Sequence, residues 1–159
     1  DGYSVVPRPV YAHGLIFMST GFDRPVVLAI KPDGKGDVTE THVAWKMEKQ
    51  APHTPSMLVA GDDLYMVADK GLVTCADART GVIRWQERVA GPCSASPLYA
   101  DGRIYIQDEK GAGHVIRAAR RLERLATNDL GEPTLASYAV SGKNLIIRTQ
   151  GAVYCIGNR

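Results

Sequence analysis

The side chains that could act as nucleophiles, bases or metal ligands are few and scattered along the chain. The histidines and cysteines are His13, His42, His53, His114, Cys75, Cys93 and Cys155. No histidine stands in a recognisable motif with a serine or cysteine nucleophile. No Cys-x-x-Cys or Cys/His spacing is typical of zinc. The sequence therefore predicts no catalytic constellation and no metal site.

The cysteines differ in their sequence context. An odd count does not make a disulfide framework. Cys75 and Cys155 lie in similar apolar phrases, Val-Thr-Cys-Ala and Val-Tyr-Cys-Ile, and are expected to be small buried side chains. Cys93 follows Gly91 and Pro92 and is expected to be more exposed, which makes it the better candidate for a reactive thiol.

One Gly-rich segment brings two carboxylates together, at Asp33 and Asp37. A calcium loop needs about six to eight oxygen ligands, and no third acidic residue is placed to help. The segment is therefore interpreted as a hairpin turn.

Composition and charge exclude several classes of function. The 159 residues carry a net charge of +2, and the basic run 117–124 is interrupted by Leu122 and Glu123, so nucleic acid is not an expected partner. No stretch reaches the roughly 18 to 20 apolar residues that span a bilayer. The chain starts at Asp1, and no leader is visible in it.

The elements that must position any site come from an internal repeat. The phrase 58–66, Leu-Val-Ala-Gly-Asp-Asp-Leu-Tyr-Met, is repeated in similar form at 10–18 and 98–106 and more weakly at 139–147. The matched anchors Ile16, Leu64, Ile104 and Leu145 are separated by 48, 40 and 41 residues. Pro52, Pro92 and Pro133 repeat with the last two of these offsets.

Each copy predicts four short strands. In the second copy the expected strands are 56–60, 64–68, 72–76 and 82–87, each bounded by turn residues. The segment 118–126 has good helix formers, but its register matches the end of the third strand and the fourth strand, so it is predicted to be strand. Four strands in about 40 residues are typical of a β-propeller blade.

The predicted fold class is therefore all-β, with four blades in one partial propeller domain, 1–159. The blades are expected at about 1–50, 51–91, 92–132 and 133–159. The first copy carries an insertion within 20–25 and 31–37, and the fourth lacks its outer strand, for which 1–6 is only a short candidate. An open arc would expose apolar blade faces, so a homo-oligomer through these edges is expected.

Four residues are predicted to shape the blades. Asp77 can accept backbone N–H bonds in the turn 77–81, and Gly81 supplies the positive φ that closes it. Trp45 and Trp85, on outer strands, are expected to fill the wedges between neighbouring blades.

These residues carry a family likeness. The segment 72–85, with Asp77, Thr80, Gly81 and Trp85, resembles the Ala-x-Asp-x-x-Thr-Gly-x-x-x-Trp phrase of pyrroloquinoline-quinone-like (PQQ-like) propeller repeats, with Cys75 in place of the alanine. The whole chain resembles the C-terminal half of such proteins from planctomycete-type bacteria. The resemblance implies a bacterial protein that is exported, to the periplasm or otherwise outside the cytoplasm.

The resemblance also raises the question of a cofactor. Quinoprotein dehydrogenases of this kind have an adjacent Cys-Cys pair, a Trp floor under the quinone and a calcium ion. This sequence has no Cys-Cys pair, and both tryptophans lie on predicted outer strands. PQQ is therefore not expected, and no other cofactor is predicted.

The linkers between blades provide the one candidate site. They are expected to emerge on one face around the channel, stiffened by proline, and to present Arg8, His53, Cys93 and Glu132. The alternative is that these segments are only tight connections.

Two functions remain open from the sequence. The first is a non-catalytic scaffold that binds a protein or small ligand, by analogy with the propeller lipoprotein of outer-membrane assembly. The second is part of a quinoprotein-type oxidoreductase, or another propeller enzyme, whose catalytic residues lie outside this chain.

Overall fold

The computed structural model describes residues 4–21 and 23–157, which fold into four antiparallel sheets. The first sheet contains β1 (Val10–Ala12), β2 (Leu15–Ser19), β3 (Val27–Ile30) and β4 (Val43–Met47). The second contains β5 (Leu58–Ala60), β6 (Asp63–Val67), β7 (Leu72–Asp77) and β8 (Ile83–Arg88). The third contains β9 (Leu98–Ala100), β10 (Arg103–Gln107), β11 (Ala112–Arg117) and β12 (Arg124–Asp129). The fourth contains β13 (Ala139–Ser141), β14 (Asn144–Arg148) and β15 (Val153–Ile156). We call these sheets blades 1 to 4.

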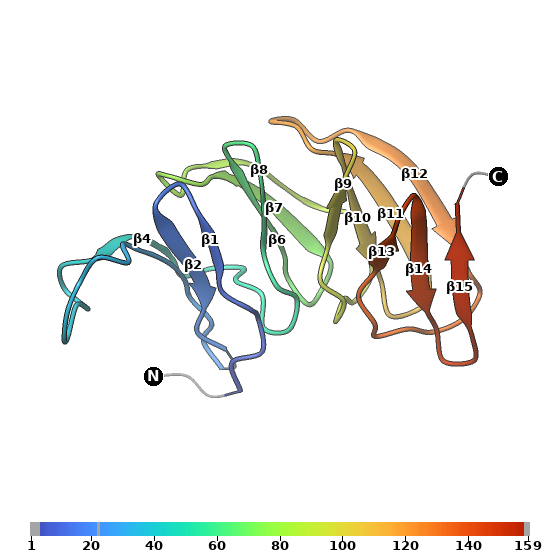
Figure 1. Cartoon of the computed structure of the whole chain (residues 1–159), viewed down its shortest axis with the longest axis horizontal. Coiled ribbons are helices and arrows are strands. Elements are labelled where there is room, and N and C mark those ends of the chain that lie inside the picture. The colour runs from blue at the N-terminus through green and yellow to red at the C-terminus, as the bar shows by residue number, and fades with distance from the viewer. Residues whose placement is uncertain (1–3, 22, 158–159) are drawn as a thin grey trace.

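The predicted all-β blade architecture is confirmed. In every blade the strands pair in chain order, and within the described residues blade 4 has three strands and no outer one. The blades follow one another in an open arc (Figure 1), with β5 in contact with β1 and β9. No helix among the described residues is long and apolar enough to cross a lipid bilayer.

Strand boundaries follow the repeat to within one or two residues in blade 2. The strand prediction for 118–126 is confirmed only for 124–126, because residues 118–123 form the connection between β11 and β12. Arg117 and Glu123 form an ion pair of 2.7 Å that closes the intervening turn, and a bulge at Val115 and Ile116 shifts the register there. Of the candidate closing strand 1–6, residues 4–6 are not in a strand and residues 1–3 lie outside the described residues.

The core consists of apolar layers between successive blades. Phe17 of blade 1 packs against Leu64 and Met66 of blade 2. Tyr65 of blade 2 packs in the same way against Ile104 and other side chains of blade 3. All five side chains are almost fully buried. Each blade therefore buries one face of its sheet only when a neighbour covers it.

A tryptophan closes each of the first two junctions. Trp45 Nε1 donates to the carbonyl oxygen of Ala78, and Trp85 Nε1 donates to that of Ala119, both at 3.0 Å. In each case the acceptor lies in the turn between the third and fourth strands of the next blade. Both rings also pack against an aromatic side chain of their own blade, with centroids 5.8 Å apart for Trp45 and Phe17.

The turn that receives Trp45 is built from its own sequence. Asp77 Oδ1 accepts the backbone N–H groups of Arg79 and Thr80 at 3.0 and 2.9 Å. Gly81 has a φ of 72°. A Cβ at this glycine would stand 2.8 Å from the Trp45 ring, so Gly81 is required both by the turn and by the ring that packs on it.

Loss of the second tryptophan should loosen the junction between blades 2 and 3. We expect Trp85→Ala to lower the free energy of unfolding by about 3 kcal/mol, because removal of this large, partly buried ring leaves a cavity between the blades. Trp85→Phe should lower it by about 1 kcal/mol, mainly through the lost hydrogen bond to Ala119. Urea unfolding followed by circular dichroism measures both.

The exposed Tyr99→Ala serves as the control, with an expected change within about 0.5 kcal/mol. If Trp85→Ala behaves like this control, the junction does not depend on the indole.

Candidate functional site

The linkers between blades are held rigidly between the turns of two blades. The N–H of Cys93 donates to the Asp69 carbonyl oxygen of blade 2 at 2.9 Å, while the Pro92 carbonyl accepts from Glu109 of blade 3 at 2.8 Å. The same pair of bonds recurs one blade later, at Thr134 and Pro133. The linker backbone is therefore fixed from both sides, as a scaffold for presented side chains requires.

The linker between blades 1 and 2 borders a groove of about 830 Å³. Its walls are Asp23, Arg24, Pro25, Val26, Glu48, Lys49, Gln50, Ala51, His53, Ala68, Asp69 and Lys70. Asp23 and Arg24 belong to the segment in which the sequence places the insertion of the first copy. We call this hollow the linker groove.

Charges of both signs line the linker groove. Its lining includes three carboxylates, of Asp23, Glu48 and Asp69, and three cationic side chains, of Arg24, Lys49 and Lys70. Asp69 Oδ2 also accepts the backbone N–H of His53 at 2.7 Å, which fixes the linker above the turn of blade 2. The groove is thus polar, rigid at its base and close to neutral overall.

One of the groove carboxylates is already engaged in an ion pair at the surface. Glu48 lies 2.6 Å from Lys46 Nζ, and both side chains are well exposed. The hydrogen bond from Lys46 lowers the pKa of Glu48. A surface ion pair of this kind contributes little to stability. Glu48 can therefore leave Lys46 and pair with a charged group of a bound partner.

Of the four predicted rim residues, only His53 lines the linker groove. Arg8 is exposed, and its backbone N–H donates to Ser56 Oγ at 2.9 Å. Glu132 instead ties its linker to blade 4, accepting from Thr149 Oγ1 at 2.5 Å and from the N–H of Gly151 at 3.3 Å. The bond from Thr149 is the main cause of a lowered pKa at Glu132. The structure therefore does not bring the four side chains together.

The expected exposure of Cys93 is wrong. Its side chain is fully buried among Tyr65, Val67 and Ile104, in the layer between blades 2 and 3. Burial, with the charges of nearby carboxylates, raises the pKa of Cys93 to about 12. The Gly-Pro turn before it exposes Pro92 and directs the next side chain inwards.

The other two cysteines differ from each other in burial. Cys75 is buried as predicted, and burial raises its pKa to about 11. Cys155 is exposed, contrary to the prediction. It pairs with Ile146 in the register in which Cys75 pairs with Tyr65, but no blade covers that face of blade 4 among the described residues.

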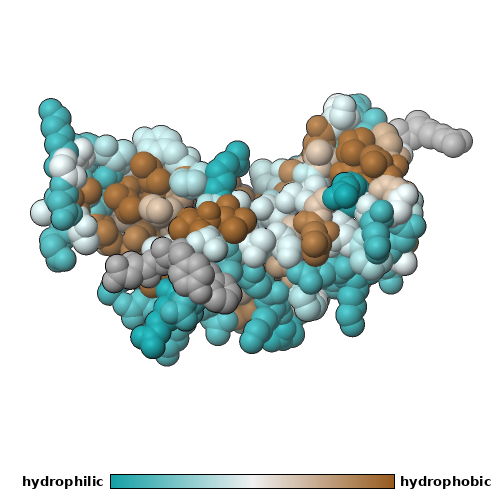
Figure 2. Space-filling model, turned by 90° about the horizontal axis from the view of Figure 1, so that it is seen from below, coloured by the Kyte–Doolittle hydropathy of each residue, from teal (hydrophilic) through white to brown (hydrophobic). Residues whose placement is uncertain are grey.

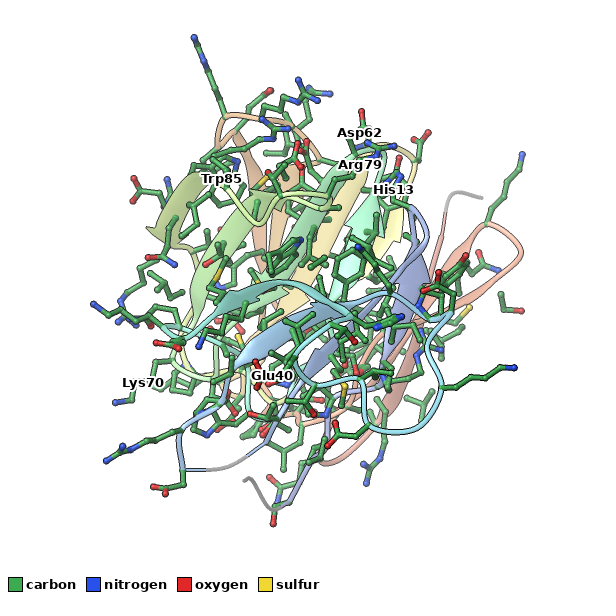
Figure 3. All side chains as sticks on the ribbon, turned by 90° about the vertical axis from the view of Figure 1, so that its left-hand side faces the viewer. His13, Glu40, Asp62, Lys70, Arg79 and Trp85 are labelled. Atoms are coloured by element: carbon green, nitrogen blue, oxygen red, sulfur yellow. The ribbon has the colours of Figure 1, made fainter. Side chains whose placement is uncertain are left out.

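The remaining histidines lie apart from one another. His13 sits in its hairpin turn with a φ of 53° and contacts Arg79, which is paired in turn with Asp62. Figure 3 shows these three side chains at one edge, away from Lys70 at the linker edge. His42 contacts Thr41, and His114 contacts Asp108. Within the described ranges, no group of three or more His, Cys, Asp or Glu is arranged to hold a metal ion.

Sequence reasoning missed a row of serines. Ser56 Oγ accepts from the N–H of Arg8, Ser96 Oγ from that of Ser56, and Ser137 Oγ from that of Ser96, each at 2.9 Å. These donor–acceptor pairs are 48, 40 and 41 residues apart, which are the offsets of the repeat. The recurrence of serine at this spacing was the available signal.

Comparison with known proteins gives a family and a fold. The family described as outer membrane protein assembly factor BamB matches residues 24–153. No curated protein matches the sequence significantly.

Three solved structures are similar to this fold. BamB from Moraxella catarrhalis has a TM-score of 0.71 and 16% identity, with 91% of this chain and 43% of that chain covered. A quinohemoprotein alcohol dehydrogenase from Pseudomonas putida has a TM-score of 0.66 and 15% identity, with 89% and 28% covered. The computationally designed Ika4 protein has a TM-score of 0.70 and 9% identity, with 98% and 92% covered. The chain thus spans less than half the length of both natural relatives.

The burial of the cysteines can be tested with a thiol reagent. With Ellman's reagent at pH 8 we expect one thiol, Cys155, to react rapidly in the native protein, since the thiolates of Cys75 and Cys93 are suppressed by burial. All three should react in urea. A Cys155→Ser variant serves as the control and should lose the rapid phase. If the rapid phase persists in it, Cys93 or Cys75 is accessible and their burial is refuted.

Proposed function

Because the chain belongs to the family described as outer membrane protein assembly factor BamB, we propose that it is a non-catalytic propeller scaffold that binds a segment of a partner protein in its linker groove. The observation that carries this proposal is the groove itself. Its base is fixed by the bond from His53 to Asp69, and its walls carry both signs of charge. Such a surface suits a polar polypeptide segment of mixed charge, whose side chains can pair along it.

The residues do not favour a catalytic alternative. The two buried thiols, of Cys75 and Cys93, have raised pKa values, which is opposite to what a nucleophile needs. Charged groups elsewhere pair with one another, as Arg84 does with Asp63 and Asp77. The proposed role is therefore binding, with specificity from the pattern of charges.

The residues also do not fit PQQ, the cofactor that the quinoprotein relatives suggest. Both indoles are committed to blade junctions, with their Nε1 atoms bonded to Ala78 and Ala119, and neither can act as a floor under a quinone. The cysteines stand far apart in sequence, without an adjacent pair. We propose that this chain binds no PQQ.

A location outside the cytoplasm is part of the same proposal. It is supported by the family's description, which names a factor of outer membrane assembly.

Photo-crosslinking from within the groove tests the partner. A photoreactive phenylalanine analogue at Lys70 should give crosslinks to a small set of proteins in the source cells, because this exposed side chain lines the groove. The same analogue at Thr127, on the outer strand β12, is the control and should not give these crosslinks. In the protein that carries the analogue at position 70, reversal of two further groove charges, in Arg24→Glu and Lys49→Glu together, should reduce crosslinking at least about tenfold.

Identical crosslinks from both positions would refute a partner in the groove. A rise in melting temperature with PQQ and calcium would favour the oxidoreductase alternative, since a ligand that binds the native state stabilises it.

We also propose that the open ends of the arc associate head to tail with a second copy. The face of blade 1 that points away from blade 2 carries the partly exposed Ile16, Met18, Leu28 and Ile30. The free face of blade 4 carries Ile146, Val153 and Cys155. Figure 2 shows apolar patches towards both ends of the arc.

These two faces are the two halves of the contact that recurs between blades. Ile16 and Met18 correspond to Leu64 and Met66, which pack against the preceding blade. Ile146 corresponds to Tyr65, which packs against the following one. The chain covers 43% of the BamB chain, so two copies joined end to end would approach the length of that relative. The contact is heterologous, and it closes only if the rotation completes a ring.

Sedimentation velocity at micromolar concentration should show a dimer. Met18→Lys should shift the protein to a monomer, because a charge cannot be buried without a partner. Val82→Lys, which changes an exposed turn residue, should leave the dimer intact. A monomeric unaltered protein at about 100 µM, a concentration well above typical micromolar dissociation constants, would overturn this association.

A further inference from the structure

The junction between blades 3 and 4 lacks the tryptophan that closes the other two. Trp85 stands opposite Cys75 in the register of blade 2, and Ala126 stands opposite Val115 at the matching position of blade 3. Ala126 is exposed, whereas Trp85 is partly buried. The space that an indole occupies in the second junction is therefore not filled by a side chain from this position in the third.

Two further replacements change the same junction: one adds a polar group and the other removes a side chain. The pair Val67 and Val73 of blade 2 corresponds in register to Gln107 and Gly113 of blade 3. A buried valine is thus replaced by an amide, and its partner by a glycine without a side chain. The changes at Ala126 and Gly113 both remove side-chain volume from the junction, and Gln107 makes it more polar.

The result is a pocket of about 280 Å³ between blades 3 and 4. Its walls are Tyr105, Gln107, Gly113, Val115, Asn128, Leu130, Tyr138, Leu145, Ile147 and Ile156. Apart from the amides of Gln107 and Asn128 and the two phenol hydroxyls, this lining is apolar. The volume exceeds that of an apolar cavity of ~150 Å³ that admits benzene. We call it the junction pocket.

Two aromatic rings form one wall of the junction pocket. Tyr105 and Tyr138 meet edge to face, with centroids 6.3 Å apart and planes at 76°. A Cβ at Gly113 would stand 2.6 Å from the Tyr138 hydroxyl, so the glycine makes room for this ring. Flat aromatic surfaces of this kind favour a flat ligand.

The polar group that points to a ligand is the Gln107 side chain. Gln107 is 1% exposed, and its Oε1 has no hydrogen-bond partner among the described residues. Its Nε2 reaches only the Asp108 carbonyl, at 3.4 Å. An acceptor buried without a partner is costly and rare, and valine at the matching position of blade 2 shows that the fold does not need an amide there.

We propose that the junction pocket binds a flat, mostly apolar molecule of one or two fused rings, whose single N–H or O–H donates to Gln107 Oε1. The ring would take the space that Trp85 fills one junction earlier, between the tyrosines and the apolar face of blade 4. This inference is independent of the linker groove, which lies between blades 1 and 2.

Indole and benzofuran are a matched pair of probes, since they share size and shape but only indole has an N–H. Isothermal titration of the full chain should show indole binding in the millimolar range or tighter. Benzofuran should bind about tenfold more weakly, because it leaves the amide oxygen unpaired. In NMR spectra, the ring signals of Tyr105 and Tyr138 should shift with indole, and those of the exposed Tyr11 should not.

Two variants locate the site. Gln107→Leu keeps the approximate volume, and it should bind indole and benzofuran with affinities equal within about twofold. Ala126→Trp should abolish indole binding, since Trp85 packs 6.2 Å from Tyr65 and Tyr105 is the matching residue of blade 3. Thr127→Trp, which places the same side chain on the other face of β12, is the control and should still bind indole.

Equal affinity of the unaltered protein for the two probes would overturn the proposal, as would no binding of either at 10 mM, a concentration at which even ligands with millimolar dissociation constants are bound. Undiminished indole binding by folded Ala126→Trp would place the ligand elsewhere. The comparison of probes uses only the unaltered chain, so it remains decisive if a variant does not fold.

Discussion

The structure depends on one contact between neighbouring blades, in which an outer-strand tryptophan of one blade packs on the turn of the next. Trp45 donates to the backbone carbonyl of Ala78, and Trp85 donates to that of Ala119, which also accepts from the Tyr65 hydroxyl. The turn of blade 2 can accept the Trp45 ring only because Gly81 has no side chain. The junction thus joins a turn motif, a strand position and a hydrophobic layer, and it fixes the spacing of blades along the arc. Where the contact is absent, at Ala126, the layer opens into the junction pocket.

Much of this fold could be predicted from the sequence, because the repeat encodes it locally. Asp77 and Gly81 specify a turn through their own hydrogen bonds and dihedral angles, and alternating residues specify the strands around them. The burial of Cys93 and the exposure of Cys155 could not be predicted in this way. Their local phrases do not reveal whether a neighbouring blade covers them, and that depends on packing between segments about 40 residues apart.

In the candidate site, too, local sequence predicts some features and tertiary packing decides others. Proline and the repeat period predicted where the linkers lie, but not what their side chains do. The sequence predicts that the Glu132 carboxylate is available to a ligand, yet it accepts hydrogen bonds from Thr149 and Gly151 of blade 4. The linker groove needs walls from both Asp23 and Lys70, which belong to different blades. Roles of this kind are set by tertiary partners that no single segment specifies.

The row of serines has a consequence for how such chains can grow. Each of Ser56 and Ser96 gives one N–H to the next blade and accepts one from the blade before. A duplicated blade would therefore bring its own donor and acceptor, and its insertion would leave neither neighbour with a missing bond. A whole blade can therefore be gained or lost without a compensating substitution nearby. The gain or loss of a single residue just before one of these serines would instead break the hydrogen bond at that point. The repeat is in this sense a unit of inheritance as well as of packing.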